Sequence, residues 1–292
     1  MTQAARVGHL SMLLFSVLVA GSFALGVLAA NDIAPMALNA VRFWIAAVII
    51  GAIAVARGGV PRAALAAPWR YLVLAAAFTL YFVLMFEGLK TAPSVSAAAV
   101  FTLTPVLTAG FGWVLLGQGV TPRIAIALTI GALGALWVIF RADLQAILRF
   151  DVGRGELIYF VGCISHSIYT PLVRKLNRGE TALVFTFGTL VAGAVLLTVV
   201  GWSDIVSTPW LALPSVVWVT ILYTAVFASA ATFTLLQFAT LRLPSSKVMA
   251  YTYLTPAWVI VWNVGLGAAL PPLAVWIGVG MTIVALVLLL RD

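Results

Sequence analysis

The chain has few charged side chains. Asp, Glu, Lys and Arg make up 8% of its 292 residues, hydrophobic residues make up 64%, and the mean hydropathy is +1.16. A water-soluble protein of this length needs more polar groups to cover its surface. The composition therefore excludes a soluble globular protein and indicates a membrane protein whose main partner is the lipid bilayer.

Cysteine and the common catalytic motifs are also nearly absent. Cys163 is the single cysteine, so neither an intrachain disulfide nor a thiolate metal cluster can form. The sequence has no phosphate-binding loop, no HExxH motif and no Gly-rich dinucleotide turn. The two histidines, His9 and His166, have no carboxylate near them in sequence to form an intramembrane active site. We expect no catalytic residue, no metal, no cofactor and no ATP-driven pumping.

Acidic side chains are scarce within the apolar stretches. Glu87, near one end of the stretch 69–89, is the one acid that we place within a span, and we expect it to pair with Lys90. No Asp or Glu is placed near the centre of a span, which argues against a built-in proton relay or a tight sodium site. A proton-coupling role for Glu87 is the alternative to the ion pair.

Long apolar runs, by contrast, are abundant. A membrane-spanning helix needs about 20 mainly apolar residues. The sequence predicts an all-α integral membrane protein with ten transmembrane helices, separated by short segments rich in Gly, Pro and Asn. The predicted spans are 8–29, 35–55, 69–89, 94–116, 122–140, 154–174, 182–201, 212–239, 246–269 and 272–290.

Lysine and arginine are distributed unevenly between the two sides of this predicted bundle. If the N-terminus is cytoplasmic, the connections on that side carry eleven basic residues, and the other side carries four: Lys90, Arg141, Arg149 and Arg154. An excess of positive charge marks the cytoplasmic side. We therefore expect both termini in the cytoplasm of a bacterial-type inner membrane. The net charge of +8 then reflects topology, and no nucleic-acid partner is expected.

Two segments of the chain are nearly the same. Residues 93–105 read PSVSAAAVFTLTP and residues 244–256 read PSSKVMAYTYLTP, with six of thirteen positions identical at an offset of 151 residues. The duplication predicts a first five-helix repeat, residues 1–150, and a second, residues 151–292. Because five is odd, the second copy enters the membrane from the opposite side. Such inverted repeats are typical of secondary transporters that work by alternating access.

Pro105 and Pro256 close the two repeated segments. Each lies about ten residues, or about 15 Å, into its span and thus near the middle of the bilayer. A proline deprives the carbonyl four residues earlier, that of Phe101 or Thr252, of its helical partner. We expect these bends to line a cavity and to act as hinges, with a simple packing kink as the alternative.

Aromatic and hydroxyl side chains collect in the third, fourth, sixth, eighth and ninth spans. Tyrosine and histidine are costly to leave in lipid without partners, so we expect them to face the bundle interior, although membrane aromatics often face lipid. Such walls suit a flat, largely apolar small molecule with small polar ends. The candidate substrate-binding residues are Phe78, Tyr81, Phe101, Thr102, His166, Tyr169, Tyr223 and Tyr253.

Arg42 lies about seven residues into the second span, where an arginine costs roughly 2.5–3.5 kcal/mol unless it is solvated or paired. We place it in the substrate-binding set as an anchor for a carboxylate. The alternatives are contacts with backbone carbonyls at a helix end, or extension of the side chain to the membrane surface. Asn39, one turn earlier on the same face, is a predicted neighbour.

These features together resemble the drug/metabolite transporter superfamily in its EamA-type branch. The resemblance rests on the two halves, the Arg-Phe of NAVRFWIAAVIIG, the Pro-Ser to Thr-Pro helix in each half, and the Leu-Gly that follows it. The family often has Leu-Gly-Glu there, whereas this chain has Gln118 and Ala268, so no role of those glutamates is carried over. Within the branch the chain looks most like bacterial exporters of aromatic amino acids.

The repeat and the resemblance together predict a secondary transporter of small amphipathic metabolites. The resemblance implies export of aromatic or other hydrophobic amino acids, and the repeat implies alternating access through a central cavity, with no oligomer required. A channel, a lipid scramblase and an exporter of other metabolites or drugs are the alternatives.

Overall fold

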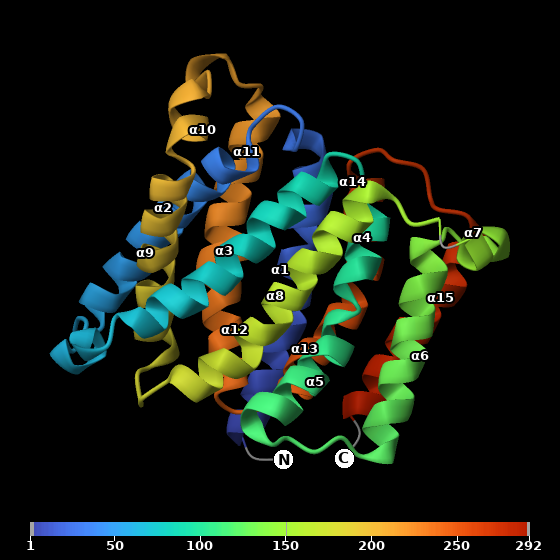
Figure 1. Ribbon diagram of the computed structural model, residues 1–292, viewed down its shortest axis with the longest axis horizontal. Helices are drawn as coiled ribbons and strands as arrows, with labels where there is room; N and C mark the ends of the chain where they lie inside the picture. Colours follow the sequence, from blue (N-terminus) through green and yellow to red (C-terminus); the bar gives the residue numbers. More distant parts are fainter. Residues whose placement is uncertain (1–2, 150, 291–292) are drawn as a thin grey trace.

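The computed structural model describes residues 3–149 and 151–290. Within these ranges the chain is helical and contains no strand. Arg291, one of the eleven basic residues assigned to the cytoplasmic side, lies outside the described residues. Figure 1 shows a bundle of steeply inclined helices with both ends of the chain at the same end of the bundle.

The helices of the first half follow the predicted spans closely. Thr121 illustrates why: its hydroxyl accepts a hydrogen bond from the Ile124 N–H, and Pro122 starts the next helix. The elements are α1 (Gln3–Ala29), α2 (Pro35–Ala56), the 3₁₀ turn η1 (Arg62–Ala66), α3 (Trp69–Leu89), α4 (Ser94–Phe101), α5 (Thr104–Leu116), α6 (Pro122–Ile139) and the short α7 (Leu144–Arg149).

The second half is less regular. It includes a π-helical segment, η3, and a 3₁₀ segment, η4, within longer helical rods. The elements are α8 (Arg154–Leu176), α9 (Ala182–Val200), α10 (Trp202–Ser207), η2 (Trp210–Ala212), α11 (Ser215–Ala225), η3 (Val226–Ala231), α12 (Thr232–Thr240), α13 (Ser245–Ala250), η4 (Tyr251–Leu254), α14 (Thr255–Gly265) and α15 (Leu273–Leu290). The sequence analysis did not predict α7, α10 or η3.

Eight helical segments of the described chain are long and apolar enough to cross a membrane. The spans predicted at 154–174 and 246–269 are not among them. Helix α8 has the length but is more polar, with charged residues at both ends and Ser165, His166 and Ser167 in the middle. The rod formed by α13 and α14 is interrupted by η4. The structure thus establishes an all-helical membrane protein but not the full count of ten crossings.

The two halves of the chain are interleaved. Helix α3 packs on α8, α2 on α9, and α6 on α15, so each pair joins a helix of residues 1–150 to a helix of residues 151–292. Helix α1 packs against α11, α12 and α14. The interior of the bundle is therefore built from both halves, and neither half encloses a core alone.

Glycines allow two of these pairs to pack closely. A Cβ atom on Gly134 of α6 would lie 2.7 Å from the Gly278 carbonyl oxygen of α15. A Cβ on Gly155 of α8 would overlap the Gly88 carbonyl of α3. Small residues at such contacts let membrane helices approach until their backbones touch. Gly134 and Gly278 therefore act as packing residues between α6 and α15.

The two proline-containing rods are broken at their middles, and the breaks meet. Helix α4 ends at Phe101 and α5 begins at Thr104, while η4 separates α13 from α14. The hydroxyl oxygens of Thr104 and Thr252 lie 3.3 Å apart. The prediction of freely available carbonyls needs a correction, because the Phe101 carbonyl accepts the Thr104 hydroxyl at 2.7 Å. The local side chain replaces the N–H that Pro105 lacks.

Candidate binding site at the centre of the bundle

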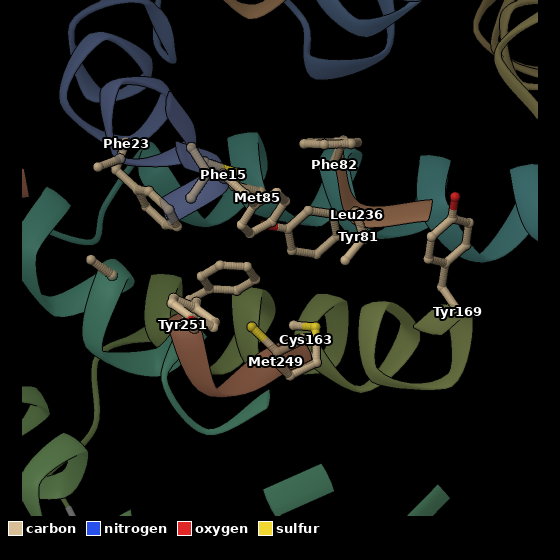
Figure 2. Close-up of a cluster of buried hydrophobic side chains, with 14 of the residues drawn as sticks. Phe15, Phe23, Tyr81, Phe82, Met85, Cys163, Tyr169, Leu236, Met249 and Tyr251 are labelled. Carbon is tan, nitrogen blue, oxygen red and sulfur yellow. The ribbon is translucent and has the colours of Figure 1, made fainter. Parts of the chain in front are cut away.

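Aromatic rings from α3, α8 and α12 pack together at the centre of the bundle. The Phe78 ring stacks on Tyr169 with centroids 4.2 Å apart and planes 7° apart, and it contacts Phe233 at 4.1 Å. Figure 2 shows Tyr81, Phe82 and Tyr169 in the region between α3 and α8. The spacing of residues 78, 81, 82 and 85 places them on one face of α3, and all four are buried there.

His166 joins this ring cluster from α8. Its ring centroid lies 4.5 Å from Tyr81, 5.2 Å from Phe78 and 5.4 Å from Phe101. Ring contacts therefore link five predicted site residues into one cluster: Phe78, Tyr81, Phe101, His166 and Tyr169. We call these five residues, with Phe82 and Phe233, the ring cluster. Phe82 and Phe233 were not among the residues predicted for the site.

Two hydrogen bonds fix the hydroxyl groups of the ring cluster. The Tyr81 and Tyr159 hydroxyl oxygens lie 3.0 Å apart, and the Gln237 Nε2 donates to the Tyr169 hydroxyl at 2.9 Å. Two buried polar atoms beside them have no protein partner, namely His166 Nδ1 and Gln237 Oε1. Buried polar atoms are nearly always hydrogen-bonded, so such exceptions mark candidate positions for a ligand or water.

Arg42 lies beside the ring cluster and is fully buried. Its guanidinium carbon is 3.7 Å from the centre of the Phe82 ring. Its Nε donates to Ser229 Oγ at 2.7 Å and its Nη2 to the Ala228 carbonyl at 2.7 Å. Among the residues that the structure describes, no carboxylate forms an ion pair with it. The positive charge of Arg42 is therefore stabilised by the Ser229 hydroxyl, the Ala228 carbonyl and the Phe82 ring, and no described carboxylate neutralises it.

Two of the acceptors for Arg42 lie in the π-helical segment η3. Ala228 and Ser229 lie in η3, where the wider helical turn changes the regular hydrogen-bonding pattern of the rod that runs from α11 to α12. Asn39 is a third partner of Arg42, since its Oδ1 accepts a hydrogen bond from Arg42 Nη1 at 3.2 Å. The sequence predicted these two residues to be neighbours. The guanidinium has five N–H donors. These three contacts leave two donors for another acceptor.

Three predicted site residues lie outside the ring cluster. The Tyr223 hydroxyl donates to the Leu18 carbonyl at 2.9 Å and packs over Gly21 of α1. The Tyr253 ring packs over Gly131 of α6. The Thr102 hydroxyl donates to the Ala99 carbonyl at 2.6 Å, at the break after α4. The Tyr223 and Tyr253 side chains thus join different helices, whereas the Thr102 hydroxyl bonds within the last turn of its own helix.

A buried ion pair joins the start of α3 to the segment before α9. Arg70 Nη2 of α3 lies 2.5 Å from Glu180 Oε1, which precedes α9, and Arg70 Nη1 donates to the Leu176 carbonyl at 2.7 Å. Burial raises the pKa of the Glu180 carboxyl, but hydrogen bonds from Arg70 and from the Arg178 N–H outweigh burial and hold that pKa below its ordinary value. Arg70 is one of the eleven basic residues assigned to the cytoplasmic side, and its contact with Glu180 was not predicted.

At the opposite end of α3, the structure confirms one predicted ion pair and corrects the account of acidic residues. Lys90 Nζ lies 2.6 Å from Glu87 Oε2. Glu87 is not the only acid within a predicted span, because Glu156 lies in the first turn of α8 and is buried. Its Oε1 accepts a hydrogen bond from Ser96 of α4 at 2.8 Å. No role for Glu156 was predicted from the sequence.

Comparison with known proteins identifies the family. A model of the EamA-like transporter family matches residues 6–140 and again residues 153–291. The chain is 26% identical over 280 residues to the uncharacterized transporter YyaM of Bacillus subtilis (strain 168), covering 95% of this chain and 91% of that protein. A solved crystal structure with 21% identity shares the fold, with a TM-score of 0.73 over 99% of this chain and 98% of its own. The chain belongs to the EamA-like transporter family, in keeping with the drug/metabolite transporter superfamily that its sequence resembles.

Proposed function

We propose that this membrane transporter exports aromatic or other hydrophobic amino acids through a central site formed by the ring cluster and Arg42. The observation that carries the proposal is a buried arginine without an acidic partner beside stacked aromatic rings. An amino acid has complementary groups, since its carboxylate would neutralise Arg42 and its side chain would replace ring contacts in the cluster.

The positive charge of Arg42 determines where we place the carboxylate of the substrate. A cation within the bilayer is stabilised strongly by an anion, and arginine binds carboxylates through paired N–H donors. Arg42 retains two such donors beyond its contacts with Ser229, Ala228 and Asn39. The substrate thus supplies the counterion that no described residue provides to Arg42.

We place the amino group and the side chain of the substrate against the ring cluster and Gln237. His166 Nδ1 and Gln237 Oε1 are buried without protein partners, so they offer acceptor positions for N–H donors. Phe78 and Tyr169 present stacked faces that an aromatic side chain would extend. The rings fill the site in this conformation, with side chains at most 2% exposed. Binding therefore requires the helices to separate.

We further propose ten membrane crossings in two inverted repeats, with alternating access. The twofold match of the family model supports the repeat, as do the interleaved halves and the two breaks that meet at Thr104 and Thr252. Both chain ends lie at one end of the bundle, which supports placing them together in the cytoplasm of a bacterial inner membrane. Pro105 and Pro256 act as hinges in this scheme.

Counterflow tests the transport function. The purified protein is reconstituted into liposomes loaded with unlabelled amino acid, and uptake of labelled Trp, Phe, Tyr, Leu and Lys is measured. We expect saturable counterflow of the aromatic amino acids and little of Lys, whose second charge has no partner in the site. Absence of counterflow for every amino acid, in folded protein, would contradict the proposal and direct attention to other metabolites or to lipid scrambling.

A variant of Arg42 tests the site itself. We expect Arg42→Gln to abolish counterflow of aromatic amino acids while the protein still elutes as a single species. Arg57→Gln is the matched control, because Arg57 ends the same helix but is exposed. Counterflow by Arg42→Gln at the wild-type rate would remove Arg42 from the substrate site and leave it a structural residue.

A further inference from the structure

Glu156 is a buried carboxylate that the central site does not use. Its side chain is 3% exposed in the first turn of α8. Ser96 Oγ donates to Oε1, whereas Oε2, which lies over Gly153, accepts no hydrogen bond from any residue that the structure describes. Within the same residues, no lysine, arginine or histidine nitrogen lies within 4.0 Å of the carboxylate. One oxygen is thus held in place and the other is available.

Two cavities meet at this carboxylate. One of about 340 Å³ is polar and opens at the end of the bundle opposite the chain termini; its wall includes Arg141, Asp143, Asp151 and Glu156. The other, of about 190 Å³, is apolar and is lined by Val100, Leu103, Leu136, Phe160 and their neighbours. Both cavities share Ile139, Phe140 and Glu156 as walls. The Glu156 carboxylate therefore lies at the boundary between the polar cavity and the apolar cavity.

The charges around the polar cavity favour a cation. Three carboxylates line it against a single guanidinium, that of Arg141. A buried carboxylate is costly without a compensating charge. The N-terminus of α8 compensates for part of the Glu156 charge, since the helix dipole favours an anion there. A ligand cation would supply the rest.

We propose that Glu156 and Ser96 form a separate binding subsite for amphiphilic amines. The ammonium group binds Glu156 Oε2 from the polar cavity, and the apolar body of the ligand lies against Val100, Leu103 and Phe160. The ammonium group matches the polar cavity, and the apolar body of the ligand matches the apolar cavity. A neutral ligand of the same shape gains the apolar contacts alone.

The subsite lies next to the ring cluster along α8. Tyr159 follows Glu156 by three residues, a rise of about 4.5 Å along the helix. The Tyr159 hydroxyl is 3.0 Å from that of Tyr81 in the ring cluster. The subsite thus lies between the centre of the bundle and the end opposite the termini. Because it is defined by binding, it does not rest on the proposed amino acid transport.

The test compares a cationic ligand with its neutral analogue. Binding of 2-phenylethylamine and of 2-phenylethanol to the full chain in lipid nanodiscs is measured by isothermal titration calorimetry. We expect Glu156→Gln to weaken amine binding at least tenfold and to leave alcohol binding within twofold of wild type. Glu87→Gln is the matched control, because Glu87 is already paired with Lys90, and it should leave amine binding unchanged.

Further variants keep the proposal falsifiable. Amine binding by Glu156→Gln equal to wild type would overturn it. If Glu156→Gln does not fold, Val100→Phe tests the apolar cavity instead and should weaken both ligands. Unchanged amine binding by that variant would overturn the proposal. Arg42→Gln should not alter amine binding, which separates this subsite from the central one.

Discussion

Single residues in this protein are held by partners far away in the chain. Arg42 takes its acceptors from Ser229 and Ala228, and Tyr223 of α11 packs over Gly21 of α1. An intramembrane arginine and a mid-depth tyrosine are conspicuous in the sequence because both are costly in lipid. Their partners are not conspicuous, since Ser, Ala and Gly are ordinary components of membrane helices.

The contact between Gly131 and Tyr253 gives a prediction at this scale. A Cβ atom at position 131 would overlap the Tyr253 ring. We expect Gly131→Ala to destabilise the protein by about 1–3 kcal/mol through overpacking, measured by thermal unfolding in detergent. Gly280→Ala is the matched control, because nothing lies within 4 Å of its added Cβ, and it should be neutral or slightly stabilising. Equal effects of the two substitutions would contradict the packing argument.

At the scale of elements, the broken rods are the part that sequence predicted best. The Leu-Thr-Pro at the end of each repeated segment located both interruptions, since proline removes a backbone donor. The structure adds that the interruptions lie against each other at Thr104 and Thr252. No local pattern encodes that contact, because it depends on how four helical pieces cross. The π-helical turn η3 was missed for a related reason, as VFASAA has no residue that forces it.

The proline breaks lead to a kinetic prediction. We expect Pro105→Ala and Pro256→Ala to slow counterflow several-fold while changing substrate affinity less than about twofold, because each restores a backbone N–H that favours a continuous helix. Affinity is measured by competition binding and rate by counterflow. Pro122→Ala, at the exposed start of α6, is the control. Unchanged transport rates in folded variants would remove the hinge role.

The Arg70–Glu180 pair leads to a prediction about pH. The pKa of Glu180 is held below its ordinary value of 4.5, so the pair stabilises the folded protein above that value and stops doing so as pH falls through the lowered pKa. We expect Glu180→Ala to lower the melting temperature at neutral pH, with a cost of about 1–3 kcal/mol. The difference from wild type should shrink on acidification. A difference that stays constant with pH would contradict this role.

At the scale of the whole molecule, the composition alone placed the chain in the membrane, and the uneven Lys and Arg distribution suggested which end is cytoplasmic. Five residues predicted from the sequence, on α3, α4 and α8, meet in the ring cluster. Tyr81, His166 and Tyr169 were expected to face the interior because such side chains are costly in lipid without partners. Tyr223 and Tyr253 lie apart from these five residues, since depth in the membrane does not specify which interior surface a side chain faces.

Chemical labelling tests the proposed orientation. Cys163 is buried, so the native chain should react little with a maleimide that does not cross membranes. We expect Leu270→Cys to be labelled on intact cells and Gly119→Cys to be labelled only after the membrane is opened, because these exposed positions lie in connections at opposite ends of the bundle. The reverse pattern would place the termini outside the cytoplasm.

The polar character of α8 has a consequence for biosynthesis. A helix with His166 and several hydroxyls at its middle enters lipid less readily than its apolar neighbours. Helices α3, α4 and α5, on which it packs, precede it in the chain and leave the ribosome first. The surface that receives α8 is therefore already in the membrane when α8 is made. The order of the two halves along the messenger RNA thus suits the assembly of the transporter, and residues 151–292 synthesised alone would leave α8 without its partner.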